Sequence, residues 1–310
     1  MVFHQIYEPI GGSIVLSALV AGIPLYVLFI MLAVFKLPAW LSAVSALLSA
    51  ALIAYLGWRM PPHLVLASTT NGMAFGLWPI SWIVLNAVFF HNLTIASGDF
   101  EVIKRSLARL TEDRRVQALL VAFSFGALLE GIAGFGAPVA ITAAILASLG
   151  FEPVTAAVLA LVANTAPVAF GSIGIPIVTL GGLTAGIIGH GAGDADRVTL
   201  AISAMVGRQL PLFSVLVPAL LVTILAGWRR MIQVLPAVVT AGLSFAIVQF
   251  LVSNFLGPQL TDILAALVSM ACLALLLTVW RPREIFRFGG EARSSVAAAG
   301  TAPTAYSGGR

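Results

Sequence analysis

The feature that most constrains this chain is a series of apolar runs, each about 20 residues long, that recur along most of its length. A helix rises about 1.5 Å per residue, so a run of this length matches the ~30 Å hydrocarbon core of a bilayer. Only 9% of the residues are charged, whereas about a quarter are charged in an average soluble protein. The sequence therefore predicts an all-α integral membrane protein.

We expect about eight transmembrane segments, including broken or re-entrant helices. Six runs stand out at residues 13–35, 39–57, 63–97, 210–228, 234–255 and 260–280. The third is too long for one straight helix and contains Gly72, Gly76 and Pro79, so it should be broken or strongly tilted. We expect one transmembrane transporter domain over residues 1–290, followed by a disordered polar tail over residues 291–310.

The basic residues predict how the chain is oriented. They gather in three segments, at residues 99–115, 229–230 and 281–293. We expect the first of these to form an amphipathic surface helix. The positive-inside rule places these three segments on the cytoplasmic side of an inner membrane. Residues 189–208 are polar and predict an external loop, so residues 116–189 should cross an odd number of times. Either three crossings or one crossing with a re-entrant hairpin satisfies this count.

A backbone break interrupts the apolar sequence after residue 130. It contains Gly131, Gly134, Phe135 and Gly136. Free backbone groups at membrane depth are tolerated only inside protein or beside a wet cavity, so the break should lie in the interior. A helix that restarts near Pro138 would direct its N-terminal amides at the break, and such amides favour anions. The pattern predicts a backbone cradle for a substrate carboxylate.

Glu130 directly precedes this break and is the only ionisable residue that we expect deep in the bilayer. An acid at that depth is costly and is therefore a functional residue by default, here a candidate proton-coupling site. The alternative is a structural role, in which Glu130 makes a buried hydrogen bond to a neighbouring helix.

A second break repeats part of the first. The sequence Ala-Pro-Val-Ala occurs at residues 137–140 and again at 166–169. Two similar broken elements are typical of the discontinuous helices that face one site in secondary transporters. Asn164, Thr165 and Ser172 would supply uncharged hydrogen bonds to the substrate. Alternatively, the small residues simply permit close helix packing.

Other kinds of site are not supported. The glycines are not in dinucleotide-binding order, and no phosphate loop is present. The four histidines have no metal-ligand spacing, and the single cysteine excludes an internal disulfide. The net charge of +4 comes from loops and tails, not from a basic face for nucleic acid. We therefore expect no enzyme, metal site, cofactor or nucleic-acid partner.

Around the two breaks, the chain resembles the lactate permease family of bacterial secondary transporters. The matching segments are residues 76–80, 125–142, 164–171, 174–177, 205–211 and 286–289. The resemblance implies uptake of a small monocarboxylate, lactate or glycolate, across the inner membrane in symport with protons.

Members of this family are usually longer, so the chain looks like the N-terminal portion of the family fold. A separate second-half polypeptide or a homo-oligomer is then a candidate partner. Two alternatives remain open on the sequence alone: an inactive or split half-transporter that serves as a membrane scaffold, and a monocarboxylate channel.

Overall fold

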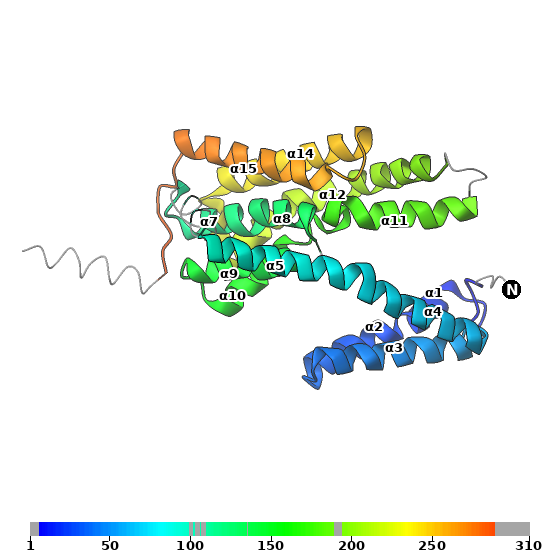
Figure 1. Cartoon of the computed structure of the whole chain (residues 1–310). Coiled ribbons are helices and arrows are strands. Elements are labelled where there is room, and N and C mark those ends of the chain that lie inside the picture. Colours follow the sequence, from blue (N-terminus) through cyan, green and yellow to red (C-terminus); the bar gives the residue numbers. More distant parts are fainter. Residues whose placement is uncertain are drawn as a thin grey trace, which may run out of the picture. The chain divides into compact units, whose positions relative to one another are not determined.

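A computed structural model describes residues 6–98, 110–134, 136–188 and 194–288, with the isolated positions 102 and 106 (Figure 1). The secondary structure of these residues is helical and contains no strand. Seven of the described helical stretches are long and apolar enough to cross a membrane, and two further apolar helices are shorter. The chain is thus an all-α, multi-pass membrane protein, as the apolar runs predict.

The chain divides into two compact units, Met1–Trp82 and Ile83–Arg310. The helices of the first unit are α1 (Ile14–Ala21), α2 (Ile23–Phe29), η1 (Ile30–Val34), α3 (Ala39–Leu56), α4 (Pro62–Phe75) and η2 (Gly76–Ile80). The first three form one membrane-length stretch, and α3 forms a second. Ser13 caps α1 by accepting a hydrogen bond from the Leu16 backbone N–H.

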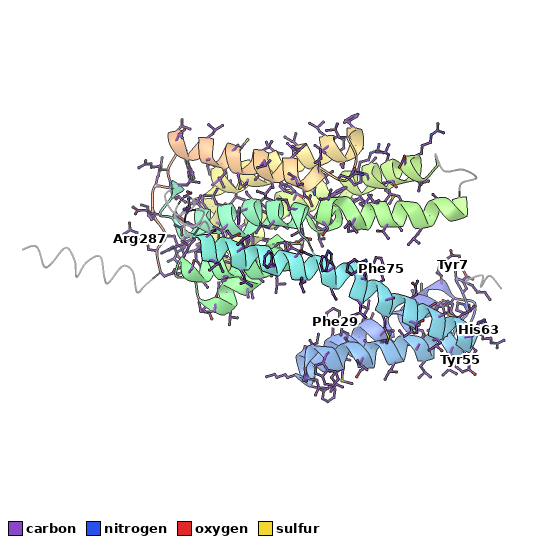
Figure 2. All side chains as sticks on the ribbon, viewed as in Figure 1. Tyr7, Phe29, Tyr55, His63, Phe75 and Arg287 are labelled. Carbon is purple, nitrogen blue, oxygen red and sulfur yellow. The ribbon has the colours of Figure 1, made fainter. Side chains whose placement is uncertain are left out.

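The first unit exposes large apolar side chains along its helices. Phe29 is 63% exposed and Phe75 is 50% exposed, and Figure 2 shows both projecting from the ribbon. Contiguous exposed apolar surface is rare on soluble proteins. In a bilayer the acyl chains cover it.

The third apolar run is broken, as expected. Trp78 adopts extended dihedral angles (φ −145°, ψ 111°) inside η2. The next residue is Pro79, whose ring disfavours the helical conformation for the residue before it. The chain resumes as a helix in α5 (Ser81–Ser97).

The second unit contains the remaining elements. They are α7 (Arg114–Ala118), η3 (Leu119–Phe125), α8 (Gly126–Ile132), α9 (Ala137–Ser148), α10 (Pro153–Ala163), η4 (Val168–Phe170), α11 (Gly171–Ile188), α12 (Asp194–Ala226), α13 (Trp228–Ile232), α14 (Leu235–Phe255) and α15 (Thr261–Val279). Helix α14 packs against both α12 and α15, and α15 packs against α8 (Figure 1). The buried core includes Phe123 and Phe245, whose ring centroids lie 5.3 Å apart.

The prediction of a loop over residues 189–208 is wrong for the part that the structure describes. Residues 189–193 lie outside the described residues, but α12 begins at Asp194 and continues for 33 residues. Asp196 lies in its first turn, where a negative charge favours a helix N-terminus. The helix then becomes apolar, so polar residues at its start do not indicate a loop.

Helices α9 and α10 pack against each other as a short hairpin. The turn between them contains Phe151, whose ring lies 5.9 Å from the Arg114 guanidinium carbon and 5.0 Å from the Phe288 ring. This turn therefore lies at the Arg114 end of α7. With 12 and 11 residues, α9 and α10 are roughly 18 Å and 16 Å long, shorter than a hydrocarbon core. The described part of residues 116–189 thus holds this short hairpin together with two stretches of membrane length, Arg114–Ile132 and Val168–Ala185, and the number of crossings stays a prediction.

Glu152 caps the start of α10. Its carboxylate accepts hydrogen bonds from the Thr155 hydroxyl at 2.6 Å, and from the backbone N–H groups of Thr155 and Val154. These bonds lower the pKa of Glu152 below its ordinary value, and the bond from the Thr155 hydroxyl has the largest effect. The cap thus contributes fully above the ordinary carboxyl pKa, and its contribution is lost as the pH falls through the lowered pKa.

Two charged residues expected on a surface helix are instead buried together. Asp113 caps α7, and Arg115 donates to both of its carboxylate oxygens, at 3.0 and 2.6 Å. The Arg115 side chain is only 1% exposed and also donates to the backbone oxygens of Arg230 and Glu284. Much of residues 99–110 lies outside the described residues. The prediction that one amphipathic surface helix extends to residue 115 is wrong, because the buried pair starts a new helix.

We expect Arg115→Ala to destabilise the protein strongly, because it leaves the Asp113 carboxylate buried without its cation. Removal of one partner of a buried ion pair costs about 3–5 kcal/mol. The exposed Arg229 offers a matched control, and Arg229→Ala should change stability by no more than about 0.5 kcal/mol. Thermal unfolding in detergent measures both. Equal unfolding temperatures for the two variants would contradict a stabilising role for the buried pair.

Candidate functional site

The first backbone break separates α8 from α9. Gly134 and Gly136 both have positive φ angles, +58° and +84°. Glycine adopts this left-handed conformation without steric cost, so the chain can turn sharply here. Pro138 then lies in the first turn of α9, where a missing backbone N–H costs nothing. Phe135 lies outside the described residues.

The second break separates α10 from the helical part of α11. Ser172, Ile173 and Gly174 adopt left-handed dihedral angles in succession, with φ of 50°, 57° and 74°. For a β-branched residue such as Ile173 this conformation is rare, and a strained non-glycine residue costs about 1–3 kcal/mol. Regular helix follows near Pro176.

The two breaks contact each other inside the second unit. The Ser172 hydroxyl donates a hydrogen bond to the Ala133 carbonyl oxygen at 2.7 Å. A Cβ on Gly134 would overlap that hydroxyl, and a Cβ on Gly171 would lie 2.5 Å from Oε1 of Glu130. Both glycines therefore permit an approach that no larger residue allows.

A second buried acid, Asp262, lies beside Glu130. Glu130 is 4% exposed on α8, and Asp262 is fully buried at the start of α15. The helices approach closely here, since a Cβ on Gly131 would lie 3.1 Å from Cβ of Asp262. Both acids are therefore buried where α8 packs against α15. The prediction that Glu130 is the only ionisable residue at depth is therefore wrong.

Uncharged polar groups surround the two acids. Asn164, at the end of α10, lies within hydrogen-bonding reach of the Glu130 carboxyl. Gln249 on α14 donates to the Ala166 carbonyl oxygen at 3.2 Å and accepts from Ser214 at 2.7 Å. Both oxygens of Asp262 and Oε2 of Glu130 are buried and have no hydrogen-bond partner in the described part of the chain.

Positive charge is absent from the described residues of the elements that pack around the acids. Helix α8 contacts η3, α9, α10, α11 and α15, and α15 also contacts α14. None of these elements contains a lysine or an arginine. Within the described ranges, no group of three or more His, Cys, Asp or Glu residues could hold a metal ion. The acid pair thus has neither a cationic side chain nor a metal cluster to balance it there.

The structure brings together five of the residues that the sequence singles out. They are Glu130, Gly131, Gly134, Asn164 and Ser172. Two others lie elsewhere. Gly136 is exposed, and a Cβ added to it would have no atom within 4 Å, while Thr165 is exposed and donates to the Val162 carbonyl oxygen at 2.7 Å. The roles assigned to all of these residues remain predictions.

Sequence reasoning missed Asp262 and Gln249. Asp262 is the only charged residue in the last apolar run, residues 260–280, which ends at Trp280. That position resembles an interfacial helix end, where a carboxylate in the first turn is common. Gln249 is the only glutamine within its own helix, α14. A polar residue inside an apolar run is the signal that could have identified both.

The fold and the site define a multi-pass α-helical membrane protein in which two broken helices meet beside buried acids. The chain belongs to the L-lactate permease family, whose family model matches residues 17–309. It is 49% identical to the L-lactate permease of Bacillus subtilis (strain 168) over 314 residues, which is 100% of this chain and 54% of the relative.

Two further relatives come from Escherichia coli (strain K12). The glycolate permease GlcA is 50% identical over 280 residues, which is 90% of this chain and 48% of the relative. An L-lactate permease is 46% identical over 294 residues, which is 95% of this chain and 51% of the relative. The chain spans about half the length of these curated relatives. No solved structure matches it significantly.

We expect Gly171→Ala to disrupt the contact between the breaks, because the new methyl group would collide with the Glu130 carboxyl. The φ angle of Gly171 is −59°, so any effect comes from this collision and not from backbone strain. Overpacking of this kind costs about 1–3 kcal/mol, measurable as a lower thermal unfolding temperature.

Gly182, in the same helix, is the matched control because nothing lies within 4 Å of a Cβ there. Gly182→Ala should leave stability unchanged or raise it by about 0.4–1 kcal/mol. A Gly171→Ala variant as stable as the Gly182→Ala variant would show that the two breaks do not pack as described.

Proposed function

We propose that this protein takes part in secondary active uptake of lactate or glycolate across the bacterial inner membrane, in symport with protons. The observation that carries the proposal is the meeting of two broken helices beside the buried carboxyl group of Glu130. Discontinuous helices that face each other form the substrate and ion sites of many secondary transporters. The L-lactate and glycolate permeases among the relatives support the substrate class.

Lactate and glycolate share one chemical pattern, a carboxylate with a hydroxyl group on the adjacent carbon. The start of α9 offers the positive end of a helix dipole, which favours the carboxylate. In this proposal Gly131 and Gly134 let the backbone approach the anion closely. The hydrogen-bonding groups of the second break then receive the substrate hydroxyl, and we assign this role to Asn164 and Ser172.

Glu130 is the proposed proton-coupling residue. An ionised carboxylate buried without a cation costs several kcal/mol, so protonation favours the buried state. A substrate anion that approaches the same place adds a further negative charge. Uptake of a proton by Glu130 removes the repulsion, and the loaded site can then cross from one access state to the other with less charge. Proton and anion binding therefore favour each other.

The test is uptake of labelled lactate and glycolate by a bacterial strain that lacks its own carriers and expresses the 310-residue chain. We expect saturable accumulation that a protonophore abolishes. Glu130→Gln should abolish accumulation while the protein still reaches the membrane. Glu152→Gln, at the exposed cap of α10, is the matched control and should leave uptake intact.

Other results would contradict the proposal in distinct ways. Accumulation that ignores the protonophore and survives Glu130→Gln would exclude the proton role of Glu130. Conductance without saturation or accumulation would indicate a channel. No uptake of either acid above background would mean that this chain does not transport these substrates.

A further inference from the structure

The acid pair has an electrostatic property that a single acid lacks. Two adjacent carboxylates repel each other, so ionisation of one disfavours ionisation of the other. Burial adds to this effect, because neither charge can be solvated by water. With both groups buried where α8 packs closely on α15, the doubly ionised state of Glu130 and Asp262 is strongly disfavoured.

The groups that face the pair offer no relief from this repulsion. The described residues of η3, α9, α10, α11 and α14 contain no ionisable side chain. On α12, which packs against α14, the Arg208 side chain is exposed, and its Nε donates to Asn254 at 3.0 Å. Asn164 and Gln249 near the acids are uncharged amides. A proton is therefore the remaining means of lowering the charge of the pair.

The two acids have unequal surroundings. Asp262 is completely buried, and neither of its oxygens has a hydrogen-bond partner among the described residues. An ionised carboxylate in that setting lacks solvent, whereas a protonated one is neutral and costs less to bury. Each acid has one uncharged amide near it, Asn164 for Glu130 and Gln249 for Asp262. Glu130 also lies beside Gly171 in the second break. Of its two oxygens only Oε2 is buried without a partner among the described residues, and Oε1 lies against Gly171 in the unwound backbone of the second break.

We propose that Asp262 is the second acid of the proton site and keeps its proton throughout, while Glu130 takes up and releases the proton that is transported. The proposal rests on the function proposed above. The pair then alternates between one negative charge and none. One proton binds to a carboxylate oxygen of Glu130 from water on one side of the membrane and leaves to water on the other. No bond other than this O–H bond forms or breaks.

This division of roles accounts for the unpartnered oxygens. A permanently protonated Asp262 holds a neutral polar group against Glu130 and limits the site to a single exchangeable charge. One substrate anion can then be matched by one proton. If Asp262 also ionised, the empty site would carry two negative charges and would repel the anion. Asp262 thus acts through Glu130, because it limits the charge that the pair can carry.

Infrared spectroscopy of the purified 310-residue chain tests the proposal without any need for transport. A protonated carboxyl group has a carbonyl stretching band that an ionised one lacks. We expect one such band to persist over the neutral and mildly alkaline pH range and to shift when the chain is made with ¹³C-labelled aspartate. Because labelling needs no substitution, this readout does not depend on how a variant folds.

Variants then assign the bands. Asp262→Asn, an uncharged mimic of the protonated acid, should remove the persistent band. Glu130→Gln should keep that band and lose the pH-dependent change. Asp196→Asn, at an exposed position of α12, is the control and should leave the persistent band unchanged.

Two outcomes would overturn the proposal: loss of the aspartate band at neutral pH, or its loss on addition of sodium at constant pH. Failure of the proposed function is separate, since wild-type chain that transports neither acid could still show the persistent band.

Discussion

The structure depends on the constraint that backbone N–H and C=O groups cannot remain unpaired in hydrocarbon. A helix break at membrane depth must therefore be covered by protein. Here each break covers the other, and the Ser172 hydroxyl satisfies the Ala133 carbonyl oxygen that the end of α8 leaves free. The cover is possible because Gly134 and Gly171 have no side chains at the point of contact.

The hairpin of α9 and α10 and the buried ion pair of Asp113 and Arg115 lie at the same end of α7. Helices α9 and α10 are too short to cross, so their connecting turn must be held at one end of the bundle. Phe151 in that turn contacts Arg114 and Phe288. The next residue after Arg114, Arg115, donates hydrogen bonds to the backbone oxygens of Arg230 and Glu284. The same end therefore fixes α7, the hairpin and the segment after α15. The arginines at this end therefore form contacts that stabilise the fold, in addition to indicating the orientation of the chain.

Local sequence predicted the breaks because glycine and proline act on the backbone where they stand. The interruption at Pro79 and the restart at Pro138 follow from steric rules that need no tertiary structure. The apolar runs likewise predicted most helices. The loop prediction failed at α12, because a polar first turn belongs to a helix as often as to a loop.

The composition of the site was harder to predict. Glu130 stands out within its own run, but its neighbour Asp262 is brought to it only by the packing of α8 on α15. Arg115 looked like a surface cation until its partners were placed around it. Contacts between helices that are distant in sequence decide both cases.

The length of α12 has a consequence for how the protein sits in lipid. Its apolar stretch of 32 residues measures about 48 Å along the axis. Even a tilt of about 40°, at the upper end of the usual range, leaves a projection of about 37 Å, more than the hydrocarbon thickness. One end of the helix must therefore stand in the headgroup region or in water. Asp196 and Arg197 lie near its start, so we expect the charged first turns of α12 to extend beyond the hydrocarbon region at that end.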